Sequence, residues 1–385
     1  MRRVATAVLT AFILISGASV YGADSTGPIK IGYLAHLTGD ASVWGIPETN
    51  TAKMAAEEIN AAGGVLGRKI EIVSMDTRSN AADAVNAVKK AVAEQNIVAV
   101  LGSNWSGINI ATSSVCAEAK IPQISSYATA VKVTINDDGS VKPWAFRTCF
   151  MDPYQGKVIA YYLFKELHKK TAAVLYDIGS DYSVGLTQYF EDNFSRLGGK
   201  VVGKWAYKAG DVDFRPQLTQ ILSKKPEVLM IPITYKDISL VVRQAMELGM
   251  ENTVIMGGDG ASPAMLAMAG PELQGSYWVK HVSPEDPIVA GIWKKYNAKY
   301  PTSGEYANIY KAYELVNFIA DIIKASGTTD GETIRKAIEN CKNFKITDGT
   351  ITMDPKTHNP LNKSAVILQA VGKELKFVTK YAPVD

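Results

Sequence analysis

Short apolar runs alternate with longer amphipathic stretches along the chain from Pro28 onward. Residues 29–34 alternate apolar and polar side chains as a strand does, and residues 49–62 carry apolar side chains at helical spacing. Residues 97–101 are continuously apolar, which is typical of a strand in a buried parallel sheet. This alternation of strand and helix signals predicts an α/β fold.

The pattern appears twice along the chain, which predicts two similar lobes. The predicted helices at 49–62 and 184–197 each end in Gly-Gly, and each is followed by a strand that leads toward an aspartate. We therefore expect two doubly wound, Rossmann-like lobes joined by a multi-strand hinge. The predicted strands are residues 29–34, 68–76, 97–101, 121–125, 172–176, 200–207, 227–233 and 253–257, with further strands within 366–381. The predicted helices are residues 49–62, 81–94, 107–120, 184–197, 214–224, 237–248, 287–300, 305–325 and 332–341.

The chain length of 385 residues fits two domains. The tail does not open a third lobe, so we expect its helices to return to lobe one and its last strands to lobe two. Lobe one is then residues 24–145 plus 282–341, and lobe two is residues 146–281 plus 342–385. The several crossings between the lobes would serve as a hinge.

The N-terminus has the pattern of an export signal over residues 1–23. A short positive segment with Arg2 and Arg3 precedes a largely apolar run and then small residues, with cleavage expected after Gly22 or Ala23. The alternative is a membrane anchor, but the run is about half of the ~20 residues that a spanning helix needs. No cysteine precedes Cys116, so no cysteine near the export signal can carry a lipid. These features predict a protein of the periplasm.

Composition excludes several classes of function. The formal net charge is only +3, which argues against the clustered cations of a nucleic-acid site. The four histidines and three cysteines show no metal-ligand spacing, and no Gly-x-Ser-x-Gly elbow, Walker loop or dinucleotide fingerprint occurs. We expect no cofactor, no metal and no catalysis. Cys116 and Cys149 could form a disulfide, or remain buried thiols.

Polar side chains follow several of the predicted strands. Ser106 lies where a helix should begin after the strand at 97–101, and a helix start with free N–H groups suits a carboxylate. Thr129 follows the next strand, and Asp259 follows a strand of lobe two, where it could pair with a ligand ammonium. The alternative for Ser106 and Asp259 is an N-cap role.

Four segments of the chain resemble the type I periplasmic binding proteins, most closely the group that binds leucine, isoleucine and valine. These segments are residues 39–45, 58–67, 121–125 and 146–148, of which the Asn-x-x-Gly-Gly-x-x-Gly run within 58–67 is the most specific. The resemblance extends over essentially the whole mature chain. It implies the type I periplasmic binding protein fold and a ligand held between the lobes.

The resemblance also implies roles for individual residues. Ser106 matches the serine that binds the ligand carboxylate, and Thr129 with the backbone around Tyr127 and Ala128 matches the element that holds the amino-acid backbone. Tyr182 matches a tyrosine of lobe two that closes over the ligand, and Asp259 the acidic partner of the ammonium. The looser matches to aromatic pocket positions are Tyr235 and Trp44.

Two departures from the group concern side-chain specificity. Trp105 and Tyr127 are bulky where the branched-chain relatives have small residues, and an early cysteine of one relative is absent. We therefore expect Trp105 to shape the ligand pocket, while the residues for the amino-acid backbone are retained.

The expected function is the extracytoplasmic binding component of an ABC importer. Its partners would be an amino acid, branched-chain or similar, and the inner-membrane permease, and it would act as a monomer. The nearest alternative is the same fold with an amide, a urea or an aromatic acid as ligand. A secreted α/β hydrolase or dehydrogenase and a receptor ectodomain are the alternatives from other classes.

Overall fold

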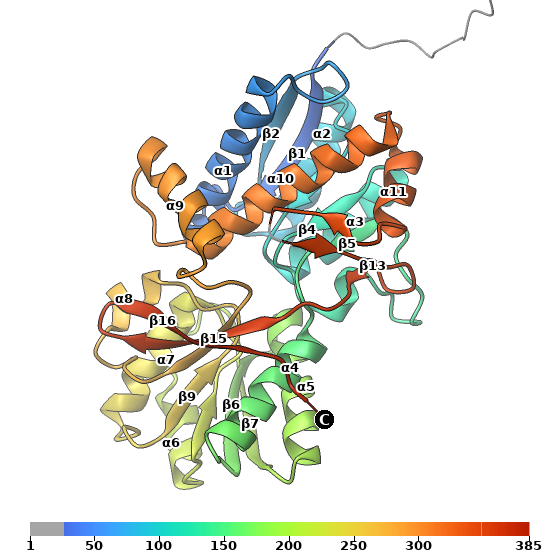
Figure 1. Ribbon diagram of the computed structural model, residues 1–385. Helices are drawn as coiled ribbons and strands as arrows, with labels where there is room; N and C mark the ends of the chain where they lie inside the picture. The colour runs from blue at the N-terminus through green and yellow to red at the C-terminus, as the bar shows by residue number, and fades with distance from the viewer. Residues whose placement is uncertain (1–26, 348, 385) are drawn as a thin grey trace, which may run out of the picture.

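The computed structural model describes residues 27–347 and 349–384, which form two α/β lobes (Figure 1). Each lobe is built on one main sheet with helices against it, as the alternation of apolar runs predicted. The predicted export signal at 1–23 lies outside the described residues.

Lobe one contains a five-stranded parallel sheet with the strand order β2-β1-β3-β4-β5. Its strands are β1 (Ile29–Ala35), β2 (Ile70–Asp76), β3 (Val100–Gly102), β4 (Gln123–Ser125) and β5 (Ala145–Arg147). The helices of this lobe are α1 (Ser42–Ala61), α2 (Ala81–Gln95), α3 (Ser106–Glu118), α10 (Tyr306–Ser326) and α11 (Gly331–Glu339). A short 3-10 helix covers Val131–Val133.

Lobe two contains a seven-stranded sheet with the strand order β16-β15-β10-β9-β8-β6-β7. The strands from β7 to β10 are parallel, and β15 and β16 add an antiparallel edge. The strands are β6 (Thr171–Asp177), β7 (Lys200–Tyr207), β8 (Val228–Met230), β9 (Val254–Gly257), β10 (Tyr277–Lys280), β15 (Ala365–Val371) and β16 (Glu374–Tyr381). The helices are α4 (Asp152–Tyr161) with its π-helical extension Tyr162–Glu166, α5 (Asp181–Arg196), α6 (Arg215–Ser223), α7 (Tyr235–Glu247) and α8 (Ala264–Ala269).

In the described part of the chain, three segments cross between the two sheets, and we call them the hinge. Residues 148–151 lead from β5 to α4, and residues 281–286 lead from β10 to α9 (Pro287–Lys299), which packs on α10. Residues 361–364 lead from the short strand β14 (Asn359–Pro360) to β15. The final strands thus lie in lobe two, as Figure 1 shows in red.

The packing of lobe one differs from the expected division at two places. Phe146 lies in the core of lobe one, so that lobe extends through β5 and past the expected boundary at residue 145. Ile351 and Met353 are buried in the same core, although residues from 342 onward were expected in lobe two. Their apolar side chains keep the small strands β11 (Phe344–Lys345), β12 (Thr350–Ile351), β13 (Met353–Asp354) and β14 on lobe one. The chain therefore crosses to lobe two only after Pro360.

The strand ends are shaped by close backbone packing. Gly102 ends β3 with a φ of +79°, and a Cβ at this position would lie 2.3 Å from the Leu34 carbonyl oxygen. Only glycine fits there without strain. This turn leads from β3 into residues 103–105, which precede α3.

Candidate functional site

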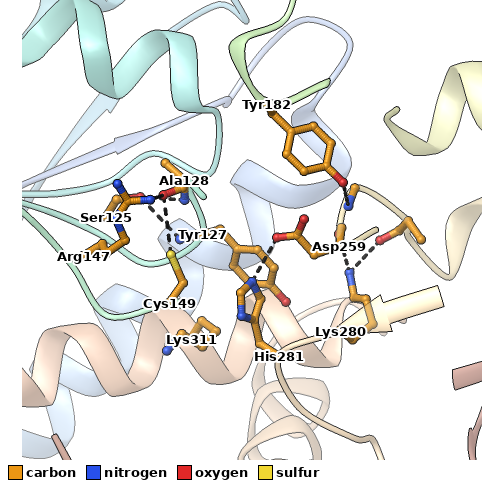
Figure 2. A network of polar contacts seen from close by, with 12 residues as sticks. Ser125, Tyr127, Ala128, Arg147, Cys149, Tyr182, Asp259, Lys280, His281 and Lys311 are labelled. Atoms are coloured by element: carbon orange, nitrogen blue, oxygen red, sulfur yellow. Dashed lines mark hydrogen bonds and ion pairs between the residues drawn. The ribbon is translucent and has the colours of Figure 1, made fainter. Parts of the chain in front are cut away.

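A cleft of about 420 Å³ lies between the lobes, at the carboxyl ends of both sets of parallel strands. This is where doubly wound sheets bind ligands. Its lining includes eight of the nine residues predicted for the site: Trp44, Trp105, Ser106, Tyr127, Thr129, Tyr182, Tyr235 and Asp259. The ninth, Ala128, is not among the lining residues. Its carbonyl oxygen accepts a hydrogen bond of 2.7 Å from Arg147, and its N–H donates to Ser125 (Figure 2).

Ser106 is the first residue of α3, and it does not cap the helix. The N-cap position is Trp105, whose side chain makes no capping hydrogen bond, so the N–H groups of this helix start face the cleft without a side-chain cap. The Ser106 hydroxyl accepts a hydrogen bond of 3.2 Å from the Ala130 N–H, which ties α3 to the loop that carries Thr129. Lobe one therefore presents a hydroxyl and a helix N-terminus, which suit an anionic group.

Aromatic rings form much of the cleft wall. The rings of Trp44 in lobe one and Tyr235 in lobe two meet edge to face, with centroids 4.9 Å apart. Trp105 packs against His36 with centroids 4.6 Å apart. The Trp105 indole N–H and the Tyr127 hydroxyl are buried without a hydrogen-bond partner, and both residues line the cleft. Buried polar groups without partners are costly, so a ligand that pairs with them is favoured.

Asp259 follows β9, and its side chain is only 4% exposed. One carboxylate oxygen, Oδ2, accepts a hydrogen bond of 3.0 Å from His281 Nε2, while Oδ1 is buried without a partner (Figure 2). The helix-cap alternative does not hold, because the N-cap of α8 is Pro263 and no side chain caps it. Asp259 is thus a cleft residue with one oxygen available.

The surroundings of Asp259 keep it ionised. Burial alone would raise the pKa of this carboxyl, but the hydrogen bond from His281, the neighbouring Gln155 amide and the Lys280 ammonium lower the pKa below its ordinary value. Burial lowers the pKa of His281 to about 4, so its imidazole is neutral near pH 7 and donates its N–H to Asp259. The Lys280 ammonium itself donates to the carbonyl oxygens of Asp259 and Ala261.

Tyr182, in the first turn of α5, lies over the same strand end. Its hydroxyl accepts a hydrogen bond of 3.2 Å from the Gly260 N–H. Burial raises its pKa well above the ordinary value, so the hydroxyl is neutral. A Cβ on Gly258 would lie 2.4 Å from this hydroxyl oxygen, so glycine allows Tyr182 to approach the backbone. Figure 2 shows Tyr182 and Asp259 side by side on lobe two.

The lobes touch directly at the mouth of the cleft. The Tyr235 hydroxyl donates to the Asp40 carbonyl oxygen over 2.9 Å, and Lys236 forms an exposed ion pair of 2.8 Å with the Asp40 carboxylate. Sequence reasoning did not select Asp40 or Lys236 as site residues. The only signal for Asp40 was its place in the segment 39–45 that resembles the family, and Lys236 looks like any surface lysine in the sequence.

Two buried acids lie behind the cleft wall, and sequence reasoning missed both. Glu48 Oε1 accepts hydrogen bonds from Asn308 at 2.6 Å and Asn104 at 3.1 Å, and both asparagines line the cleft. Burial raises the pKa of Glu48 to about 8. Glu305 pairs with Ser262, and burial raises its pKa to about 7.

The described residues contain no group of three or more histidine, cysteine or acidic side chains that could hold a metal ion. Cys116, Cys149 and Cys341 are buried free thiols, which decides between the two alternatives for Cys116 and Cys149. Within 27–347 and 349–384, no helix combines the length and the apolar character needed to cross a membrane.

Two doubly wound lobes that meet over a cleft, with a carboxylate on one side and a helix start on the other, define a two-lobed ligand-binding protein. The chain belongs to the periplasmic binding protein family, whose model matches residues 28–374. This membership confirms the expected fold class and the expectation of a binding protein rather than an enzyme.

Relatives support the same assignment. The chain is 30% identical over 329 residues to the Leu/Ile/Val-binding protein BraC3 of Rhizobium johnstonii. The aligned region covers 84% of this chain and 87% of the relative. A crystal structure of the leucine-binding protein LivK from Thermotoga maritima superposes with a TM-score of 0.84 at 30% identity, over 92% of this chain and 99% of that one. The branched-chain amino acid binding protein LivJ of Streptococcus pneumoniae, solved in complex with isoleucine, superposes with a TM-score of 0.82 at 28% identity. That superposition covers 92% of this chain and 100% of the LivJ chain.

Proposed function

We propose that the protein is the solute-binding component of an ABC importer and holds a branched-chain or similar amino acid in the cleft. The observation that carries this proposal is the buried, ionised carboxylate of Asp259 with its free Oδ1, opposite the helix start at Ser106. An α-amino acid carries a cation and an anion on neighbouring groups, which matches these two sides. The names of the relatives support the same ligand class.

In this proposal, lobe one binds the ligand first. Ser106, Thr129 and the N–H groups at the start of α3 take the carboxylate, and the unpaired hydroxyl of Tyr127 offers a further polar contact. Ala128 has no ligand contact in the proposal, because both of its backbone polar groups are engaged within lobe one.

Lobe two then closes over the bound ligand. Asp259 receives the ammonium, Tyr182 covers it, and Trp44, Trp105 and Tyr235 enclose the side chain. Charge-assisted hydrogen bonds in a cleft without water are strong, and a ligand that leaves Asp259 unpaired is penalised. The ligand shifts the equilibrium between the open and closed forms only through interactions that it makes in the closed form and not in the open one.

The location and partners follow from the same role. We propose that residues 1–23 are a cleaved export signal, that the mature protein acts as a monomer in the periplasm, and that a membrane permease recognises its closed form. Intact-mass analysis of periplasmic protein tests the first point. The expected mass is that of a chain that begins near Ala23 or Asp24. A mass that still includes residues 1–22 would contradict the proposed cleavage.

A ligand screen on the mature protein tests the function. Leucine, isoleucine and valine are expected to raise the melting temperature, because a ligand that binds only the folded state stabilises it by mass action. Amides, urea and aromatic acids lack the ammonium and are expected to have little effect. Stabilisation by an aromatic acid but by no amino acid would assign the cleft to the alternative ligand class.

A further inference from the structure

His281 connects the ligand cleft to the hinge. It is the first residue of the hinge segment 281–286, directly after β10, and its side chain is only 5% exposed. Its Nε2 lies 3.0 Å from Asp259 Oδ2 (Figure 2). Sequence reasoning found no metal-ligand spacing around the histidines and assigned His281 no role, because nothing in the sequence places it next to Asp259.

The ring of His281 also touches lobe one and a second hinge segment. It meets the Tyr127 ring edge on, with centroids 4.4 Å apart, and packs on Phe150 of the segment 148–151 at 3.8 Å. Tyr127 lines the cleft. One side chain of the hinge segment 281–286 therefore contacts lobe one, the acid of lobe two and a second hinge segment.

A second cavity of about 610 Å³ lies on the hinge side of His281. All three hinge segments contribute to its lining, and His281 is among the lining residues. His281 does not line the cleft itself, so it lies between the hinge cavity and the cleft residue Asp259.

We propose that His281 is a positioning residue that holds the Asp259 carboxylate with Oδ1 turned toward the ligand ammonium and couples that contact to the hinge. This inference rests on the proposed function, because it concerns the same acid and the same ligand group. When a ligand ammonium pairs with Oδ1, the position of Asp259 is fixed from both sides. The hinge segment that carries His281 is then fixed with it.

Other charged and titratable groups also face this pair. Lys280 on β10 and Lys311 on α10 face His281, while Gln155 and Asp152 on α4 and the hydroxyls of Tyr127 and Tyr182 face Asp259. Among them, the neutral imidazole of His281 donates the hydrogen bond that orients Oδ2. Removing that donor is therefore expected to raise the pKa of Asp259.

Two variants separate the hydrogen bond from ring packing. His281→Phe keeps an aromatic ring against Tyr127 and Phe150 but has no donor, whereas His281→Gln keeps an N–H donor without the ring. By calorimetry, His281→Phe is expected to weaken leucine binding by about 10- to 100-fold, as for the loss of one hydrogen bond to a charged group. His281→Gln is expected to retain affinity within about fivefold.

Two further readouts exclude a purely structural role. Binding of 4-methylpentanoate, which is leucine without its ammonium, should be equally weak in all three proteins. In His281→Phe, leucine affinity should begin to fall at a higher pH than in the wild type as the pH is lowered, because binding needs ionised Asp259. Equal losses for leucine and 4-methylpentanoate, or an unshifted pH profile, would overturn the proposal.

Nitrogen NMR of the ligand-free protein separates this inference from the proposed function. His281 is expected to be neutral with its proton on Nε2 at pH 7, and Asp259→Asn should perturb that signal. A charged ring or a proton on Nδ1 would refute the positioning role even if leucine binds. If the wild type binds no amino acid while the NMR result holds, the proposed function is wrong, and so is the coupling to an ammonium.

Discussion

Asp259 is the residue on which the proposed amino-acid specificity depends most directly. Asp259→Asn keeps the size of the side chain but removes its charge, so a ligand ammonium loses its buried partner. Loss of one partner of a buried charge pair costs about 2–5 kcal/mol, so leucine affinity should fall by roughly two orders of magnitude or more. Ser106→Ala should cost about 1.5–3 kcal/mol, because the helix N–H groups remain. Calorimetry and melting curves on both variants decide whether the loss lies in binding or in stability. Unchanged leucine affinity in Asp259→Asn would rule out the ammonium contact.

Glu48 provides a prediction about stability and pH. Burial raises the pKa of Glu48 to about 8 in the folded protein, against an ordinary value of 4.5, so the unfolded chain loses this proton at lower pH than the folded protein does. Stability is therefore fully present below pH 4.5 and declines as the pH rises toward 8. Glu48→Gln mimics the protonated form. It should match the wild type at pH 4.5 and be more stable at pH 8 by roughly 2–4 kcal/mol. Denaturant unfolding without ligand, at both pH values, measures this, and equal stabilities at pH 8 would show that Glu48 is ionised in the folded state.

At the scale of single residues, the sequence predicts cleft residues that directly follow strands, and it misses residues whose hydrogen-bond partners are distant in the chain. Ser106, Thr129 and Asp259 were found because the carboxyl ends of parallel strands converge on one cleft. His281 and Glu48 were missed because their partners, Asp259 and Asn308, lie 22 and 260 residues away along the chain. Such pairs are visible only once the fold brings them together.

The elements were predicted best where one simple pattern dominates. The strand at 200–207 begins and ends as expected, and the predicted helix at 81–94 falls one residue short of α2. The helix α4 was missed, because its buried residues include Asp152, Gln155 and Gly156 and so hide the apolar stripe. The strand β10 was also missed, since four residues are too few for a periodic signal. The helix α1 begins at Ser42, seven residues before the predicted start, and contains Pro47 within its first two turns.

Gly102 provides a prediction at the scale of the strand β3. Gly102→Ala should destabilise the protein for two reasons, a positive φ and a Cβ 2.3 Å from the Leu34 carbonyl oxygen. Gly139 is the matched control, because its φ of +83° is similar but no atom lies within 4 Å of the added Cβ. Gly139→Ala should cost about 1–2 kcal/mol from the backbone conformation alone. Gly102→Ala should cost clearly more, and it should also weaken ligand binding, because residues 103–106 shift with the strand end. Equal unfolding free energies for the two variants would show that the strand end relaxes around the methyl group.

At the scale of the whole molecule, two polar contacts join the lobes at the mouth of the cleft. The ion pair between Lys236 and Asp40 is exposed on both sides, and such pairs contribute only about 0–1 kcal/mol. The Tyr235 hydroxyl adds one hydrogen bond to the Asp40 backbone. The rings of Trp44 and Tyr235 add an aromatic contact between the lobes. Because the two polar contacts contribute little, we expect a ligand that bridges Ser106 and Asp259 to contribute much of the energy for closure.

The weak polar contacts between the lobes predict that ligand binding closes the cleft and compacts the protein. Small-angle scattering should show a smaller radius of gyration with saturating leucine than without it, while circular dichroism stays unchanged, because rigid lobes rotate about the hinge. The combined variant Tyr235→Phe with Lys236→Gln removes both mouth contacts but keeps the ring against Trp44. It should still compact with leucine, its affinity should fall only about 2- to 10-fold, and the loss should appear as faster dissociation. The Asp259→Asn variant should instead fail to compact at the same leucine concentration. If the mouth variant abolishes compaction while Asp259→Asn preserves it, closure is driven by contacts between the lobes and not by the ligand.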